Sequence, residues 1–149
     1  MTVEQRRSPR FVDYLPLEVH AIDRLSGAIL AGPFSGRIID ISLHGACLLM
    51  SQVFRDGYHL FHSTRDNGAA LLRLTLDQPA DLAGFTLSAW PIWMNLYRLR
   101  DISAFKMGVD FLENPEAERM QELKQAIRQN QDQRAHWWHQ HRTALARND

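Results

Sequence analysis

The sequence predicts a mainly β protein in which six short strands close into one antiparallel barrel, followed by a C-terminal α-helix. Three observations predict this class. Apolar and polar residues alternate in several short segments before residue 113. Turn residues separate these segments, with no helical period between them, which argues against a parallel α/β sheet. After residue 113 the apolar spacing changes to three and four, as in a helix.

The first three strands are expected in the N-terminal half of the barrel, which we place over residues 11–113. Residues 15–25 alternate, and a turn at Ser26 and Gly27 follows. The second strand is expected after Gly32 and Pro33, through the segment FSGRIIDIS, and the third is GACLLM. The side chains predicted to share the buried face of the first strand are Leu15, Leu17, Val19 and Ala21.

The stretch from residue 51 to 68 is expected to be a long connection, because it carries several turn signals. Its local structure stays open. Three more strands are predicted behind it, in AALLRLTL, GFTLSAWPIWMN and FKMGVDFL. Gly84 and Gly108 are expected at a tight bend or a bulge.

The predicted helix begins behind Asn114 as a cap, with Pro115 at its first position, and residues 114–149 form the helix and tail. Its first half has an apolar stripe of Met120, Leu123 and Ile127. This stripe can dock on the barrel or on another subunit, so a homodimer through this helix stays open.

Composition excludes several classes of protein. The 149 residues suffice for one compact domain, and 17 basic side chains balance 17 acidic ones, which argues against a dedicated nucleic-acid-binding protein. The single Cys47 cannot form an internal disulfide, and neither a signal peptide nor a membrane span is recognisable. We therefore expect a cytoplasmic protein.

Two motifs carry the functional prediction. Arg6 and Arg10 lie four residues apart in RRSPR, on an Arg-rich arm over residues 1–10 that we expect to be flexible, and DISLHG follows at residues 40–45. The order RxxxR then DxSxxG, with FKMGVDFL as the last strand, resembles the PilZ domain, a six-stranded barrel family that binds cyclic di-GMP. The resemblance spans residues 6 to 112.

The resemblance implies that Arg6 and Arg10 grip phosphate and guanine, that Asp40 and Ser42 contact the guanine edge, and that Gly45 permits the turn. The hydrogen-bonding chemistry of these side chains is consistent with the implied roles. A guanidinium holds phosphate or guanine acceptors with two parallel donors, and a carboxylate accepts from guanine N1 and N2. We expect Gly45 to adopt a positive φ where a side chain would clash.

Three further residues have two interpretations each, and a fourth has one. Arg7 adds a phosphate contact or is solvated, and Trp90 stacks on a purine or packs in the core. His44 touches the ligand or is a solvated turn residue. Cys47 is expected to be a small buried residue without chemistry.

The sequence thus predicts a cyclic di-GMP receptor, not an enzyme, that signals occupancy to an unidentified effector protein by ordering its arm. A hydrolase using Asp40 with His20 or His44 is the enzyme alternative, without a recognised catalytic motif. The others are a barrel binding single-stranded nucleic acid and an interaction module without ligand. We expect no cofactor and no metal, although His136, His139 and His141 cluster on the predicted helix.

Overall fold

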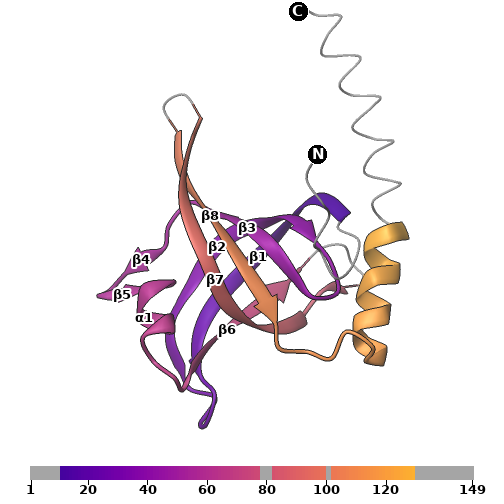
Figure 1. The fold of residues 1–149 in the computed structure, drawn as a ribbon, viewed down its shortest axis with the longest axis horizontal. Helices are drawn as coiled ribbons and strands as arrows, with labels where there is room; N and C mark the ends of the chain where they lie inside the picture. Colours follow the sequence, from indigo (N-terminus) through magenta and orange to yellow (C-terminus); the bar gives the residue numbers. More distant parts are fainter. Residues whose placement is uncertain (1–10, 78–81, 100–101, 130–149) are drawn as a thin grey trace, which may run out of the picture.

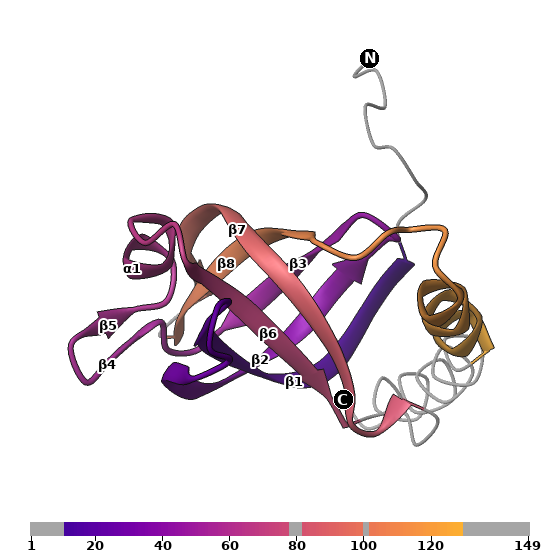
Figure 2. The same ribbon diagram turned by 90° about the horizontal axis from the view of Figure 1, so that it is seen from below.

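A closed barrel of six antiparallel strands forms the body of the protein, in the spatial order β1-β2-β3-β8-β7-β6 (Figures 1 and 2). The structure, a computed structural model, describes residues 11–77, 82–99 and 102–129. The strands are β1 (Phe11–Asp23), β2 (Ile29–Ile41), β3 (Gly45–Met50), β6 (Ala70–Leu76), β7 (Phe85–Leu99) and β8 (Ile102–Phe111). The predicted barrel and its C-terminal helix are confirmed.

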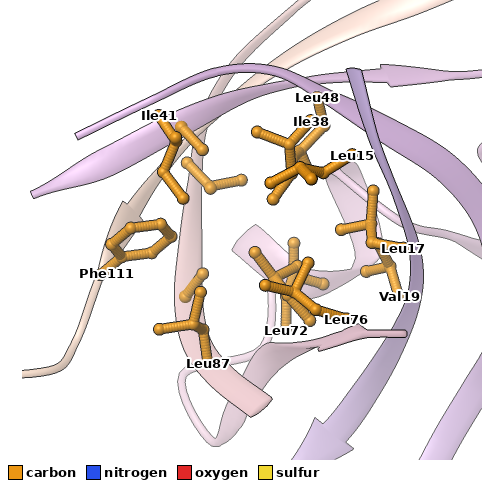
Figure 3. Close-up of a cluster of buried hydrophobic side chains, with 14 of the residues drawn as sticks. Leu15, Leu17, Val19, Ile38, Ile41, Leu48, Leu72, Leu76, Leu87 and Phe111 are labelled. Carbon is orange, nitrogen blue, oxygen red and sulfur yellow. The ribbon is translucent and has the colours of Figure 1, made fainter. Parts of the chain in front are cut away.

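The barrel interior is filled by the alternating apolar residues of the strands (Figure 3). The face predicted for β1 is correct, because Leu15, Leu17, Val19 and Ala21 are all buried. Phe34 and Ile38 of β2 and Leu48 of β3 continue the same cluster. Because side chains occupy the interior, a ligand site has to lie on the outside of this barrel.

The second strand begins earlier than predicted. β2 starts at Ile29 and runs through the cis peptide bond between Gly32 and Pro33. Val19 pairs with Phe34 but Ala21 pairs with Ala31, so the extra β2 residues at this point form an irregularity in the ladder. A Gly-Pro pair reads as a strand boundary in sequence, whereas here the irregularity accommodates it inside the strand.

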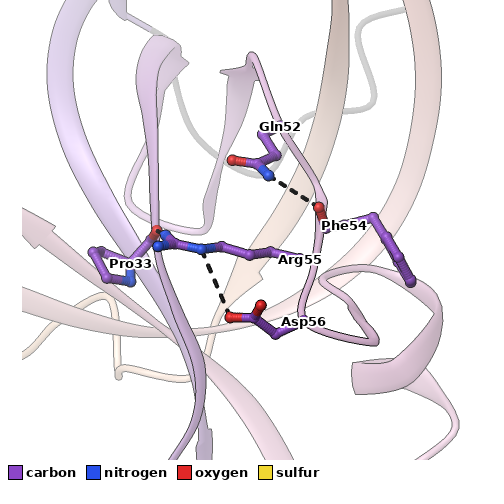
Figure 4. Close-up of polar contacts among 5 residues, drawn as sticks. All are labelled: Pro33, Gln52, Phe54, Arg55 and Asp56. Atoms are coloured by element: carbon purple, nitrogen blue, oxygen red, sulfur yellow. Dashed lines mark hydrogen bonds and ion pairs between the residues drawn. The ribbon is translucent and has the colours of Figure 1, made fainter.

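The open segment between β3 and β6 folds as a small hairpin and one helical turn: β4 (Phe54–Arg55), β5 (Tyr58–His59) and α1 (His62–Arg65). Arg55 attaches the hairpin to β2 by donating from Nη1 to the Pro33 carbonyl oxygen at 3.0 Å (Figure 4). Val53 and Leu60 are buried in the barrel cluster. This segment, which we call the β4–α1 cap, therefore covers one end of the barrel.

The C-terminal helix covers the other end of the barrel, and its described part runs from residue 118 to 129. Asn114 Oδ1 accepts the Glu116 N–H at 2.9 Å in the turn that leads into it. Met120, Leu123 and Ile127 are each at most 1% exposed and belong to the barrel cluster, so the stripe docks on its own barrel. Within the described residues no helix is long and apolar enough to cross a membrane.

Candidate functional site

Asp40 lies on the outer face of the barrel because of a bulge in β2. Ile38 pairs with Leu48 and Asp40 pairs with Cys47, so β2 has one residue more than β3 between these pairs. Strict alternation from the buried Ile38 would turn Asp40 inward, and the extra residue turns it outward. The carboxylate is half-buried at this position.

Ser42 is buried and organises the turn between β2 and β3. The backbone N–H groups of His44 and Gly45 donate to Ser42 Oγ at 3.2 and 3.3 Å, and the Ser42 N–H donates to the Gly45 carbonyl oxygen at 2.8 Å. A hydroxyl has two acceptor sites and one donor. Both acceptor sites are thus used within the turn, and the hydroxyl also donates to the Gly45 carbonyl oxygen at 3.4 Å, so its donor and its acceptor sites are all engaged there.

Gly45 is required for a reason other than the expected one. Its φ is not among the positive φ angles of the described glycines, so the turn does not need a left-handed residue here. A Cβ at Gly45 would instead collide with the Val109 carbonyl oxygen of β8. The glycine permits the close approach of β3 and β8, which are paired from Gly45 and Asp110 onward.

The RxxxR arginines, Arg6, Arg7 and Arg10, lie outside the described residues. Their point of attachment is nevertheless defined, because Phe11 pairs with Ile41 and Val12 pairs with Asp40. The start of β1, which directly follows the RxxxR motif in the sequence, therefore lies beside Asp40 and the Ser42 turn.

An open groove with a volume of about 520 Å³ lies at Arg37, three residues before Asp40 on β2, and Asp40 is not among the residues that line it. It crosses β1, β2, β3 and β8, and Pro16, Arg37 and Leu49 are among the residues that line it. These three residues are register partners of one another, on the same face as Asp40. The volume falls within the range of about 300–1,000 Å³ that is usual for small-molecule sites.

Trp90 is half-buried on β7, where its register partner is Asp110, the partner of Gly45. The Arg65 guanidinium of α1 lies 5.7 Å from the centre of the Trp90 ring, and Arg65 Nη1 donates to the Pro91 carbonyl oxygen at 2.6 Å. A cation thus contacts the indole. Neither of the predicted roles for Trp90, core packing or base stacking, describes this contact, and stacking stays a prediction.

Trp93, which the sequence analysis did not single out, lies on the same outer face as Asp40. Its indole rests on Gly108 of β8, where a Cβ would meet indole Nε1, Cε2 and Cδ1. The side chain is 41% exposed. The sequence contains one signal for this contact, a glycine that pairs with a tryptophan on the neighbouring strand. Recognising that pair requires the strand register, which the sequence alone does not give.

The alternative of a hydrolase that pairs Asp40 with His20 does not fit the fold. Val12 pairs with Asp40, whereas His20 lies eight residues further along β1 and pairs with Arg73. Eight residues of strand span about 26 Å. Among the residues that the structure describes, no three His, Cys, Asp or Glu side chains gather into a metal-binding group, and His136, His139 and His141 lie outside them.

Comparisons with known proteins bear on the fold. No family model matches the sequence, and no curated protein matches it. Solved structures define the class of fold, which is that of PilZ domains. The chain is similar to the PilZ domain of YcgR from Escherichia coli, solved with c-di-GMP, with a TM-score of 0.58 and 14% identity over 89% of this chain and 95% of that one. PlzA of Borreliella burgdorferi, in complex with c-di-GMP, has a TM-score of 0.49 and 12% identity over 85% of this chain and 53% of that one.

Proposed function

We propose that the protein is a receptor that binds cyclic di-GMP on the outer face of the barrel and carries out no covalent chemistry. The observation that supports this most is the position of the start of β1. Val12, two residues after Arg10 in the sequence, pairs with Asp40, which the bulge in β2 turns to the outer face. The PilZ fold, shared with a domain that was solved with c-di-GMP, agrees with this proposal.

The chemistry of the proposed site assigns a separate role to each group. Asp40 accepts hydrogen bonds from N1 and N2 of guanine, and Arg6 and Arg10, with Arg7 as a further contact, bind the phosphates or the guanine O6 and N7. Ser42 contacts the guanine edge by redirecting its hydroxyl hydrogen toward a ligand acceptor from the Gly45 carbonyl oxygen, to which it donates at 3.4 Å. Gly45 has no ligand role in this scheme and sets the approach of β3 to β8.

We further propose that the ligand signals by ordering the arm against the outer face. Fixing each arm residue costs about 1–2 kcal/mol of conformational entropy, and the charge-assisted bonds of the arginines to the two phosphates offset that cost. The ordered arm would cover a surface that an unidentified effector protein distinguishes from the free one. The barrel itself need not move.

Calorimetry with cyclic di-GMP tests the binding proposal. We expect Asp40→Ala and Arg10→Ala each to weaken binding at least tenfold, since a hydrogen bond to a charged group contributes about 1.5–3 kcal/mol. Asp66→Ala, an exposed carboxylate in the β4–α1 cap, is the matched control and should bind as the parent does. Equal affinity of all variants, with unchanged circular dichroism, would refute the site, and no binding by the parent would refute the function.

Hydrogen exchange tests the arm mechanism separately. We expect the amides of residues 2–12 to gain protection when cyclic di-GMP binds, and Asp40→Ala to lose that gain. Equal protection with and without ligand in a protein that binds would eliminate the mechanism while leaving the receptor function intact.

A further inference from the structure

We propose that Trp93 is the surface on which a base of the ligand stacks, so that the binding site extends across the outer face from Asp40 to β7. This inference rests on the proposed function, because it assigns a further specificity-determining residue to the same site. The inference is based on a row of four residues, one from each of four neighbouring strands. The row is defined by the register and is called the outer row: Asp40 of β2, Cys47 of β3, Gly108 of β8 and Trp93 of β7.

A bulge places each end of the outer row. On β7, Pro91 pairs with Val109 and Trp93 pairs with Gly108, so Ile92 is the extra residue. Strict alternation from the buried Pro91 would turn Trp93 inward, and the bulge turns it outward, as the β2 bulge does for Asp40. Bulges that reorient a side chain are concentrated next to functional sites.

The middle of the outer row has almost no side-chain bulk. Cys47 is small and Gly108 has no side chain, and both are buried, Gly108 beneath the Trp93 indole. Three strand spacings separate the two ends, and the indole lies back over Gly108, which leaves about 10 Å between Asp40 and the ring. A base that contacts this row would therefore stack on the exposed part of the indole, above the sheet.

The environment of Trp93 suits stacking better than that of Trp90. Trp90 is half-buried and is contacted by the Arg65 guanidinium. Trp93 is supported from below by Gly108 and is 41% exposed. Lys106, the next outer residue of β8, contacts Tyr97, with Nζ 4.5 Å from that ring centre. An exposed aromatic face is a surface on which a purine can stack.

The test is calorimetry with cyclic di-GMP on three variants and a control. We expect Trp93→Ala to weaken binding by about 5- to 150-fold, which corresponds to the loss of one base stack, and Trp93→Phe to retain most of the affinity. Gly108→Ala should resemble Trp93→Ala, because its Cβ displaces the indole. Ile92→Ala is the matched control, since Ile92 is the adjacent residue and is equally exposed at 41%.

Tryptophan fluorescence adds a measurement that would not change on ligand binding if Trp93 had only a structural role. In a Trp90→Phe, Trp137→Phe, Trp138→Phe variant, Trp93 is the one indole left of the four in the sequence, and we expect cyclic di-GMP to quench it. Parental affinity in Trp93→Ala, together with loss of binding in Asp40→Ala, would overturn this inference and leave the receptor function standing. Weakening by Trp90→Ala instead of Trp93→Ala would also overturn it. Absence of binding by the parent would overturn both.

Discussion

Gly45 and Gly108 lack a side chain for related steric reasons at two places in the barrel. At Gly45 the backbone of β8 occupies the volume that a Cβ would need, and at Gly108 the indole of Trp93 occupies it. Neither position has a positive φ. In both cases the glycine is explained by what lies against it, and the turn that the sequence suggested for Gly45 plays no part.

Gly45→Ala is expected to destabilise the fold by about 1–3 kcal/mol, because the new Cβ would have to push β3 away from β8. Urea unfolding measures the loss. Gly68→Ala is the control, since no atom lies within 4 Å of a Cβ built there and its φ is not positive. Equal stability of the two variants would contradict the explanation.

The predicted site residues come from the motif and its chemistry, whereas their surroundings depend on the strand register. Asp40, Ser42 and Gly45 were identified from the motif, and the structure places them together at the end of β2 and the start of β3. The turn bonds of Ser42 are local, to His44 and Gly45. The exposure of Trp93 could not be predicted, because it depends on the bulge in β7 and on the pairing of β7 with β8.

The C-terminal helix acts as a lid on the barrel end nearest the Ser42 turn. Leu123 and Ile127 line a small cavity together with Ile41, Ser42 and Leu43. The helix is also fixed at its start, where Arg119 Nη1 forms an ion pair with Glu113 Oε1 at 3.0 Å. Removing residues 116–149 is therefore expected to expose core residues and to lower stability, and not only to alter solubility or association.

Leu123→Ala is expected to cost about 2–5 kcal/mol, because the side chain is 1% exposed within the barrel cluster. Thermal and urea unfolding would measure this loss of stability. Glu122→Ala, one residue away on the exposed side, should change stability by less than about 0.5 kcal/mol. A small cost at Leu123 would mean that the helix does not pack on the barrel in solution.

The β4–α1 cap is expected to loosen in acid because of His59. His59 Nδ1 accepts the N–H groups of Phe61 and His62 at 3.2 and 3.1 Å, which requires an unprotonated nitrogen. Burial lowers the pKa of His59 from its ordinary 6.5, and the neighbouring His62 lowers it further. The stabilisation is therefore complete above about pH 6.5 and is lost as the pH falls through the lowered pKa.

Hydrogen exchange at the amides of Phe61 and His62, measured at pH 7.5 and pH 5.5 and corrected for intrinsic rates, checks this. Protection should fall at the lower pH in the parent and depend less on pH in His59→Gln. A parent and a variant with the same pH dependence would show that other groups control the cap.

At the scale of the whole molecule, the sequence predicted the barrel because its strands alternate cleanly around one core. Leu72, Leu74 and Leu76 of β6, for example, are all fully buried as their spacing indicated. The closing of each barrel end was less predictable. The β4–α1 cap contributes Val53 and Leu60 from a segment without a regular apolar period. The apolar stripe of the helix was compatible with docking on the barrel and with docking on another subunit.

We expect the barrel and the helix to unfold in one cooperative transition, because their buried side chains form a single cluster. Far-ultraviolet circular dichroism reports the helix, and fluorescence of a Trp137→Phe, Trp138→Phe variant reports β7. The two urea midpoints should coincide. An earlier midpoint for the helix signal would show that the lid opens on an intact barrel.

The β7–β8 hairpin projects beyond the barrel (Figure 1), and its position has a consequence for self-association. The pairing of β7 with β6 ends at Ala89 in the described residues, although β7 continues with β8 to Leu99. Such a strand edge, here with exposed Leu96 and Tyr97, is a template for aggregation. Pro91 offers no N–H there, Arg65 occupies its carbonyl oxygen, and the Ile92 bulge distorts the strand next to it. The irregularity that presents Trp93 is thus also expected to hinder the pairing of another chain with β7 at Pro91 and Ile92.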